Sequence, residues 1–196
     1  PNASKPRYIW IDAAANFPDF ANSKENIARD LALAKDAGFT DIVVDVRPTT
    51  GDVLFKTNLV DQVKFMYAWI GSNYTKVERT ATWDYLQAFV DEARKQGLRI
   101  HAAINTFVGG NQIDGGTGLL YRDQSKAEWA TQMNMQVGIT SVMNTSESTK
   151  FFNPAHPEVQ TFLCDLLKDL AGYDLDGIFL DRGRFLNLQA DFSDES

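Results

Sequence analysis

The chain has 196 residues, of which 44% are hydrophobic and 23% are charged, so it is long enough to form one domain with a sizeable core. Its formal net charge of -7 disfavours nucleic-acid binding, because phosphate contacts need clustered lysine and arginine, and it favours a neutral ligand. No apolar run reaches the ~18 residues of a membrane-spanning helix, so we expect no membrane span.

Four short apolar runs predict strands, and three amphipathic patterns between them predict helices. The expected strands are 7–13, 41–47, 99–107 and 175–181, and the expected helices are 23–38, 82–97 and 156–173. Ser23 and Thr82 are predicted to cap the first two helices, and Gly38 and Gly97 to end them. The order βαβαβαβ predicts a parallel sheet with right-handed crossovers.

Connection lengths predict which end of this sheet carries function. Each helix returns to the next strand through a short link, near Phe39, Leu98 and Tyr173, whereas 48–81 and 108–155 are long segments from a strand to a helix. This asymmetry is typical of a barrel whose site lies at the carboxyl ends of its strands. A doubly wound sheet obeys the same rule, but its glycine-rich turn should follow the first strand, where this chain has no glycine.

A (β/α)8 barrel of the TIM type needs eight strands, and this chain supplies four. We therefore predict an α/β fold of TIM-barrel type with about four βα units. Residues 1–196 would form a single partial barrel, the catalytic domain of a longer protein. Such a half barrel leaves its first and fourth strands unpaired, which predicts self-association through the open edges.

Polar side chains at the strand ends are candidates for a site. Asp45 and Arg47 share one face of the second strand, His101 and Asn105 share one face of the third, and Asp181 ends the fourth. Such groups converge at the mouth of a barrel. Burying a charge there is unfavourable unless it is paired with an opposite charge or takes part in binding or catalysis.

Asp181 is the candidate catalytic residue, and it is followed by two arginines. Arg182 and Arg184 are able to hold its carboxylate ionised, in which state it can act as a nucleophile or stabilise an oxocarbenium-like transition state. The alternative is a structural ion pair that closes the rim of the barrel, and the periodicity does not separate the two interpretations.

Three stretches carry a family resemblance: "VVDVRPTTGDVLF", "LRIHAAINTF" and "FFNPAHPEVQTFLCDLLKDLAGYDLDGIFLDRGRF". In order and spacing they resemble the N-terminal half of the glycosyl-hydrolase-like family 10 proteins. The resemblance implies a TIM-barrel enzyme acting on glycans, often exported to the bacterial envelope. It also implies Asp181 as the catalytic candidate and Arg47, His101 and Asn105 as site-lining residues. The family commonly has a second acid after this aspartate, where this chain has Arg182.

The predicted substrate-binding residues are Asp45, Arg47, His101, Asn105, Arg184, Tyr67 and Trp69. Several have structural alternatives: Arg47 can pair with Asp45 or Asp181 to neutralise buried charge, and His101 is more typical of a hydrogen-bonded core histidine than of a catalytic one. Tyr67 and Trp69 lie in the first long segment, where aromatic rings either stack on sugars or pack the loop.

The predicted function is hydrolysis of glycosidic bonds in a polysaccharide or a peptidoglycan-type glycan, by a protein that is secreted, periplasmic or in the cell envelope. The alternative is a carbohydrate-binding half barrel without turnover. A glycosidase normally needs two carboxylates, and Asp45 is a weaker candidate for the second than an acid on a later strand. We expect a carbohydrate partner and neither a metal nor another cofactor, since Cys164 is the only cysteine and the two histidines lack metal-site spacing.

Overall fold

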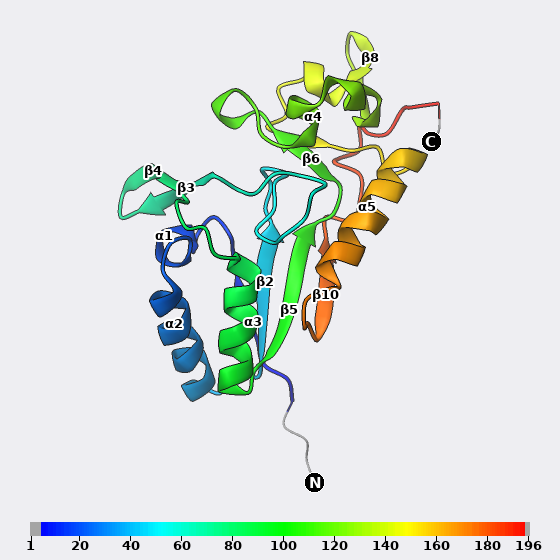
Figure 1. The fold of residues 1–196 in the computed structure, drawn as a ribbon. Coiled ribbons are helices and arrows are strands. Elements are labelled where there is room, and N and C mark those ends of the chain that lie inside the picture. Colours follow the sequence, from blue (N-terminus) through cyan, green and yellow to red (C-terminus); the bar gives the residue numbers. More distant parts are fainter. Residues whose placement is uncertain (1–4, 195–196) are drawn as a thin grey trace.

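The computed structural model describes residues 5–194, and a four-stranded parallel sheet runs through its centre (Figure 1). The strands are β1 (Tyr8–Ile11), β2 (Asp41–Arg47), β5 (Arg99–Asn105) and β10 (Gly177–Asp181), hydrogen-bonded in the order β1-β2-β5-β10. They are the four strands that the sequence predicts, so the α/β class is confirmed.

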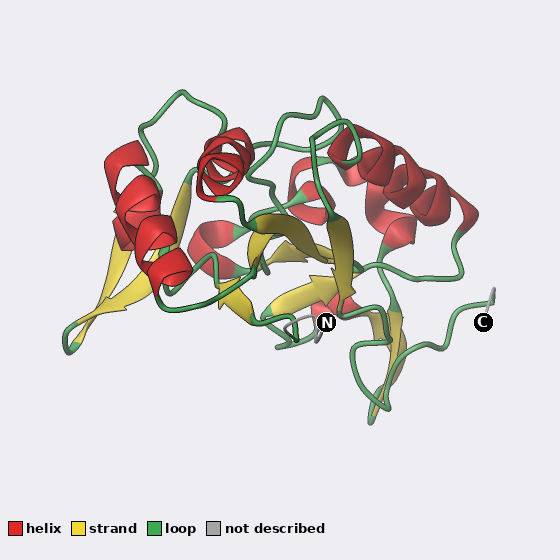
Figure 2. Ribbon diagram, turned by 90° about the horizontal axis from the view of Figure 1, so that it is seen from below, coloured by secondary structure: helices red, strands yellow, loops and turns green. Residues whose placement is uncertain are grey.

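Three long helices connect these strands: α2 (Lys24–Asp36), α3 (Tyr85–Gln96) and α5 (Pro157–Leu170). Seen from below, they lie along one side of the sheet (Figure 2). Ser23 caps α2 as predicted, by accepting the Asn26 N–H. The predicted cap Thr82 of α3 is wrong, because Asp84 accepts the Gln87 N–H instead and the helix begins one residue after it.

The two long segments contain small elements that the sequence did not predict. The first holds a hairpin of β3 (Phe65–Ile70) and β4 (Asn73–Glu78). The second holds β6 (Val108–Asn111) paired with β9 (Thr149–Phe151), and β7 (Gln132–Met135) paired with β8 (Gly138–Ser141). Short helices complete the chain: α1 (Phe17–Phe20), η1 (Ile113–Gly115), α4 (Leu119–Arg122), η2 (Gln124–Trp129) and η3 (Val142–Asn144).

The two faces of the sheet have different surroundings. Ile42, Val44, Ile100 and Ala102 belong to the core that also contains the buried residues of the helices. The alternate residues form the opposite face, which no helix covers; we call it the open face and define it by Tyr8, Trp10, Val43, His101 and Phe179. Tyr8, Trp10 and Phe179 are 51%, 46% and 37% exposed. The Phe179 ring contacts those of Tyr8, Trp10 and His101, and the Tyr8 ring also contacts His101.

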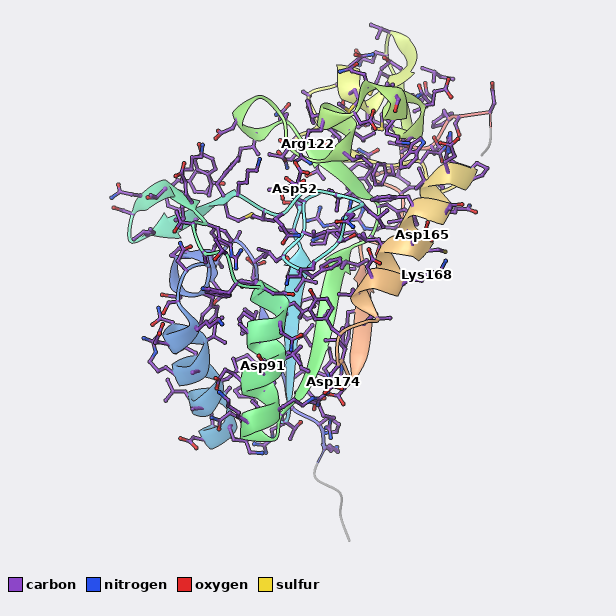
Figure 3. The ribbon with its side chains drawn as sticks, in the orientation of Figure 1. Asp52, Asp91, Arg122, Asp165, Lys168 and Asp174 are labelled. Atoms are coloured by element: carbon purple, nitrogen blue, oxygen red, sulfur yellow. The ribbon has the colours of Figure 1, made fainter. Side chains whose placement is uncertain are left out.

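Both long segments lie beyond the carboxyl ends of the strands, at the top of Figure 1, as the connection lengths predict. An ion pair joins them there: Arg122 of α4 donates to both carboxylate oxygens of Asp52 at 2.6 Å (Figure 3). At the opposite end, Arg94 near the end of α3 pairs with Asp174 and Asp176 of a short link. The two ends of the sheet therefore differ: the long segments lie at the carboxyl ends of the strands, and the opposite end, which we call the plain end, carries the short links.

Within residues 5–194, no helix combines the length and the apolar character needed to cross a lipid bilayer.

Candidate active site

A pocket of about 140 Å³ lies at the carboxyl ends of the sheet strands. Three aspartates line it: Asp12 directly after β1, Asp45 on β2 and Asp181 at the end of β10. Asn105, at the end of β5, and Arg182 line it as well. We call this the acidic pocket. Each of the four parallel strands thus contributes a polar group to one place, as barrel-type sites require.

Asp45 is the buried member of the three, with 9% of its surface exposed. It sits at a bulge, since the pairing register shifts between Asp45 and Arg47, and its carboxylate accepts the Arg47 N–H at 3.2 Å. Burial raises the pKa of Asp45 to about 7, and the negative charges of Asp12 and Asp181 also favour the protonated form. At neutral pH both the acid and its conjugate base are therefore populated.

Asp181 is exposed at the end of β10, where it pairs in register with Asn105. Its carboxylate accepts the Arg182 N–H at 2.7 Å, and its carbonyl accepts the N–H and the hydroxyl of Thr106, both at 2.8 Å. Arg182 has a φ of +47°, a backbone conformation that side-chain-bearing residues rarely adopt and that is often found at functional sites. The hydrogen bonds to the carboxylate and the carbonyl of Asp181 therefore hold the end of β10 in place.

The side chains of the two predicted arginine partners form no ion pair with Asp181. Arg184 donates to the carbonyl oxygens of Phe185 and Leu186, at 3.0 and 2.9 Å. In the part of the chain that the structure describes, no ion pair joins Asp181 to Arg182 or Arg184. Arg184 is not among the residues that line the acidic pocket, and the rim ion pair of the alternative interpretation is not formed by these described residues.

Arg47, a predicted substrate-binding residue, is not among the residues that line the acidic pocket. The bulge places Arg47 opposite Ile104, a core residue, instead of on the face of Asp45. The side chain is fully buried, and its guanidinium donates to the carbonyl oxygens of Asn105, Thr106 and Val108. Burial lowers its pKa to about 10, which leaves it charged at neutral pH. Arg47 clamps the end of β5 to the end of β2.

Asn105 takes part in the same clamp while lining the pocket. Its side-chain amide donates to the Arg47 carbonyl at 2.8 Å, so the amide plane is held and one edge faces the pocket residues. Asn105 is placed as predicted, although no contact with a ligand tests its role.

His101 lies near the plain end of the sheet, away from the acidic pocket. Its Nε2 is 2.8 Å from a carboxylate oxygen of buried Asp41, which Arg99 also binds. The ring packs against Tyr8 and Phe179. His101 therefore has the environment of the hydrogen-bonded core histidine in the alternative interpretation, and it is not among the residues that line the acidic pocket.

A second pocket, of about 340 Å³, adjoins the first. Ala14, Thr49 and Met66 line both pockets, so the two are direct neighbours. Tyr67 lines this second pocket, as a substrate-binding role requires. Trp69, from the same hairpin, is 69% exposed and lines neither pocket.

Asp12 is a site residue that the sequence analysis missed. It comes two positions after Trp10, in the alternation Tyr8, Trp10, Asp12 that defines one face of the first strand. That spacing could have identified it.

Among residues 5–194, no three carboxylate, imidazole or thiol groups are arranged to hold a metal ion, so the three aspartates share a pocket without forming a metal-ligand group.

Comparison with known proteins finds a relative in sequence and several solved structures with a similar fold. An S-layer-related protein of Niallia circulans is 31% identical over 98% of this chain, and the matched part is 12% of that protein's length. A hypothetical protein from Ruminiclostridium thermocellum ATCC 27405 superposes with a TM-score of 0.60 at 15% identity, over 95% of this chain and 81% of that one. Alpha-L-fucosidase isoenzyme 2 from Paenibacillus thiaminolyticus superposes with a TM-score of 0.58 at 18% identity, over 90% of this chain and 23% of the enzyme.

The structural likenesses concern the fold alone, because their sequence identities are low. The family assignment comes from the sequence: the model of the glycosyl hydrolase-like 10 family matches residues 5–192. Together with the parallel sheet and its polar strand ends, that match confirms the resemblance seen in the sequence. The chain belongs to the glycosyl hydrolase-like 10 family.

Proposed function

We propose that this chain carries the catalytic centre of a glycoside hydrolase, in which the sheet β1-β2-β5-β10 forms the first four βα units of a (β/α)8 barrel. The acidic pocket is then the place where the glycosidic bond is cleaved. The observation that carries this proposal is the pair of carboxylates, Asp45 and Asp181, that share one pocket in different environments. Two carboxylates whose surroundings separate their roles are what glycoside hydrolysis requires.

The environments assign a role to each carboxylate. Asp45, with a pKa raised to about 7, is partly protonated at neutral pH and can donate a proton to the oxygen of the departing sugar. Asp181 is exposed at the pocket rim and can supply a carboxylate to the anomeric carbon, as a nucleophile or as a stabiliser of positive charge. Asp12 adds a third negative charge that favours the protonated form of Asp45.

The substrate class follows from the charge of the site and from the relative. A pocket lined by three aspartates and one arginine favours a neutral sugar ring over an acidic one. The S-layer-related relative supports a location at the cell surface, where the substrates would be envelope polysaccharides or peptidoglycan-type glycans. A binding module without turnover is the second candidate, favoured by the open face, which leaves this half of the proposed barrel uncovered.

The test is release of new reducing ends from polysaccharides and peptidoglycan strands. Wild-type chain, Asp181→Asn and Asp45→Asn are compared, with Asp91→Asn as the matched control because Asp91 is exposed on α3, away from the pocket (Figure 3). With these substitutions made in the full-length protein that contains this chain, we expect turnover by the wild type and Asp91→Asn and its loss in the other two, with melting temperatures held or raised. Binding of glycans by the wild type without any release would favour the binding module.

A further inference from the structure

We propose that the second pocket is a subsite for a neutral sugar ring, so that the glycan runs from the acidic pocket beneath the β3–β4 hairpin. We call this pocket the neutral subsite and define it by Phe65, Tyr67, Tyr74, Asn111 and Gln112. The inference rests on the proposed function, and it adds the direction of the glycan and the chemistry of the unit next to the cleaved bond.

The sizes of the two pockets favour a ligand that extends across both. The acidic pocket, at about 140 Å³, is smaller than the ~300–1,000 Å³ of ordinary small-molecule sites, whereas the adjoining pocket, at about 340 Å³, falls within that range. Thr49 and Met66 line both, so the two pockets adjoin at these residues. A chain of two sugar rings fits such a pair better than one ring does.

The lining of the neutral subsite carries no charged side chain. Aromatic rings come from the hairpin, side-chain amides come from Asn111 and Gln112, and hydroxyl groups come from Thr49, Thr50 and Ser148. A pyranose ring offers an apolar C–H face and an edge of hydroxyl groups, which match a ring surface and a set of neutral hydrogen-bonding groups. A uronate would meet no cation here and would face the aspartates of the adjoining pocket.

The aromatic wall is held in place before any ligand arrives. The Tyr67 hydroxyl donates to Asp114 at 2.9 Å, and Lys76 pairs with the other oxygen of Asp114 at 2.7 Å. Tyr67 also stacks on Tyr74 with ring centroids 5.3 Å apart, and the Lys76 ammonium lies over Phe65 at 4.4 Å. Because Asp114 belongs to η1 in the second long segment, these contacts join both walls of the subsite. A preorganised wall lowers the entropic cost of binding.

The experiment measures the affinity of the Asp181→Asn chain, which should bind without cleaving, by calorimetry. The probes are cello-, chito- and malto-oligosaccharides of one to six units, with oligogalacturonides as the anionic series. Tyr67→Ala is introduced into this chain. Tyr67→Phe is the matched control, since it keeps the ring and removes only the hydroxyl that binds Asp114, and Trp69→Ala removes an exposed ring outside both pockets.

We expect at least one neutral series to bind, with affinity rising from one unit to three. Tyr67→Ala should weaken trisaccharide binding roughly tenfold, about 1.4 kcal/mol, and leave the single unit unchanged. Tyr67→Phe, which keeps the ring but loses the hydrogen bond to Asp114, should weaken trisaccharide binding less than Tyr67→Ala does, and Trp69→Ala should stay within about twofold of the parent chain. Oligogalacturonides should not bind.

The proposal is overturned if Tyr67→Ala leaves the trisaccharide affinity unchanged, if it weakens one unit and three units equally, or if oligogalacturonides bind more tightly than every neutral series. Any of these results together with Asp181-dependent hydrolysis would leave the proposed function standing and remove the subsite alone. Absence of binding to all series, together with absence of hydrolysis, would remove both.

Discussion

Replacing Asp45 by asparagine should stabilise the protein at neutral pH and change how its stability depends on pH. The free energy of unfolding falls with rising pH wherever the folded state binds more protons than the unfolded state. Between an ordinary aspartate pKa of 3.8 and the folded value of about 7, Asp45 keeps its proton only when folded. The wild type therefore loses stability as pH rises from about 4 to about 7.

The magnitude follows from that interval. A difference of about three pH units at about 1.4 kcal/mol each gives about 4 kcal/mol as the upper bound above pH 7. The asparagine of the variant would mimic the protonated acid, because its side-chain carbonyl can still accept the Arg47 N–H. Asp45→Asn should thus exceed the wild type by up to about 4 kcal/mol at pH 7.5 and by about 1 kcal/mol or less near pH 4.5.

The assay is urea unfolding of the wild type, Asp45→Asn and Asp91→Asn at three or more pH values. Asp91→Asn should follow the wild type at every pH, since its carboxylate is exposed. Equal stability of wild type and Asp45→Asn at pH 7.5, or a difference between them that does not grow with pH, would refute the reasoning that burial holds a proton on Asp45.

Three further predictions concern other parts of the molecule. Arg47→Met should cost about 3 kcal/mol or more in chemical unfolding, because three buried carbonyl groups lose their donor; a loss below about 0.5 kcal/mol would contradict the clamp. Gly177→Ala should cost about 1–3 kcal/mol, measured in the same way, since a Cβ there would lie 2.7 Å from His101 Nδ1; an unchanged midpoint would show that the ring moves freely. The chain should self-associate at micromolar concentration in light scattering, because Trp10 and Phe179 are exposed on the open face; a clean monomer that binds no hydrophobic dye would count against this.

Local patterns were enough to predict the parallel sheet and its helices. The strands are short apolar runs, and the helix starts and ends are marked by capping residues such as Ser23 and Gly97. The α3 cap was misplaced because Thr82 and Asp84 are both capable caps two positions apart, and contacts elsewhere select between them. Tyr173, for example, donates its hydroxyl to the second oxygen of Asp84 at 2.5 Å.

The alternation of side chains along the strands predicted some site residues and misplaced others. Asn105 and Asp181 reach the acidic pocket because strict alternation holds to the ends of β5 and β10. Arg47 was misplaced because the bulge after Asp45 moves it to the core side of the sheet, and nothing in the alternation of 41–47 indicates that bulge. The pairings within the long segments, such as β3 with β4, form between loops of mixed composition and were likewise not predicted.

The most direct test of the account is a crystal structure of the Asp181→Asn chain with a bound neutral trisaccharide from the series that binds best. The account predicts one sugar ring in the acidic pocket beside Asp12 and Asp45, and the next ring against Tyr67 in the neutral subsite. A trisaccharide bound elsewhere, for example against Tyr8 and Trp10 on the open face, with the acidic pocket free of sugar, would contradict it.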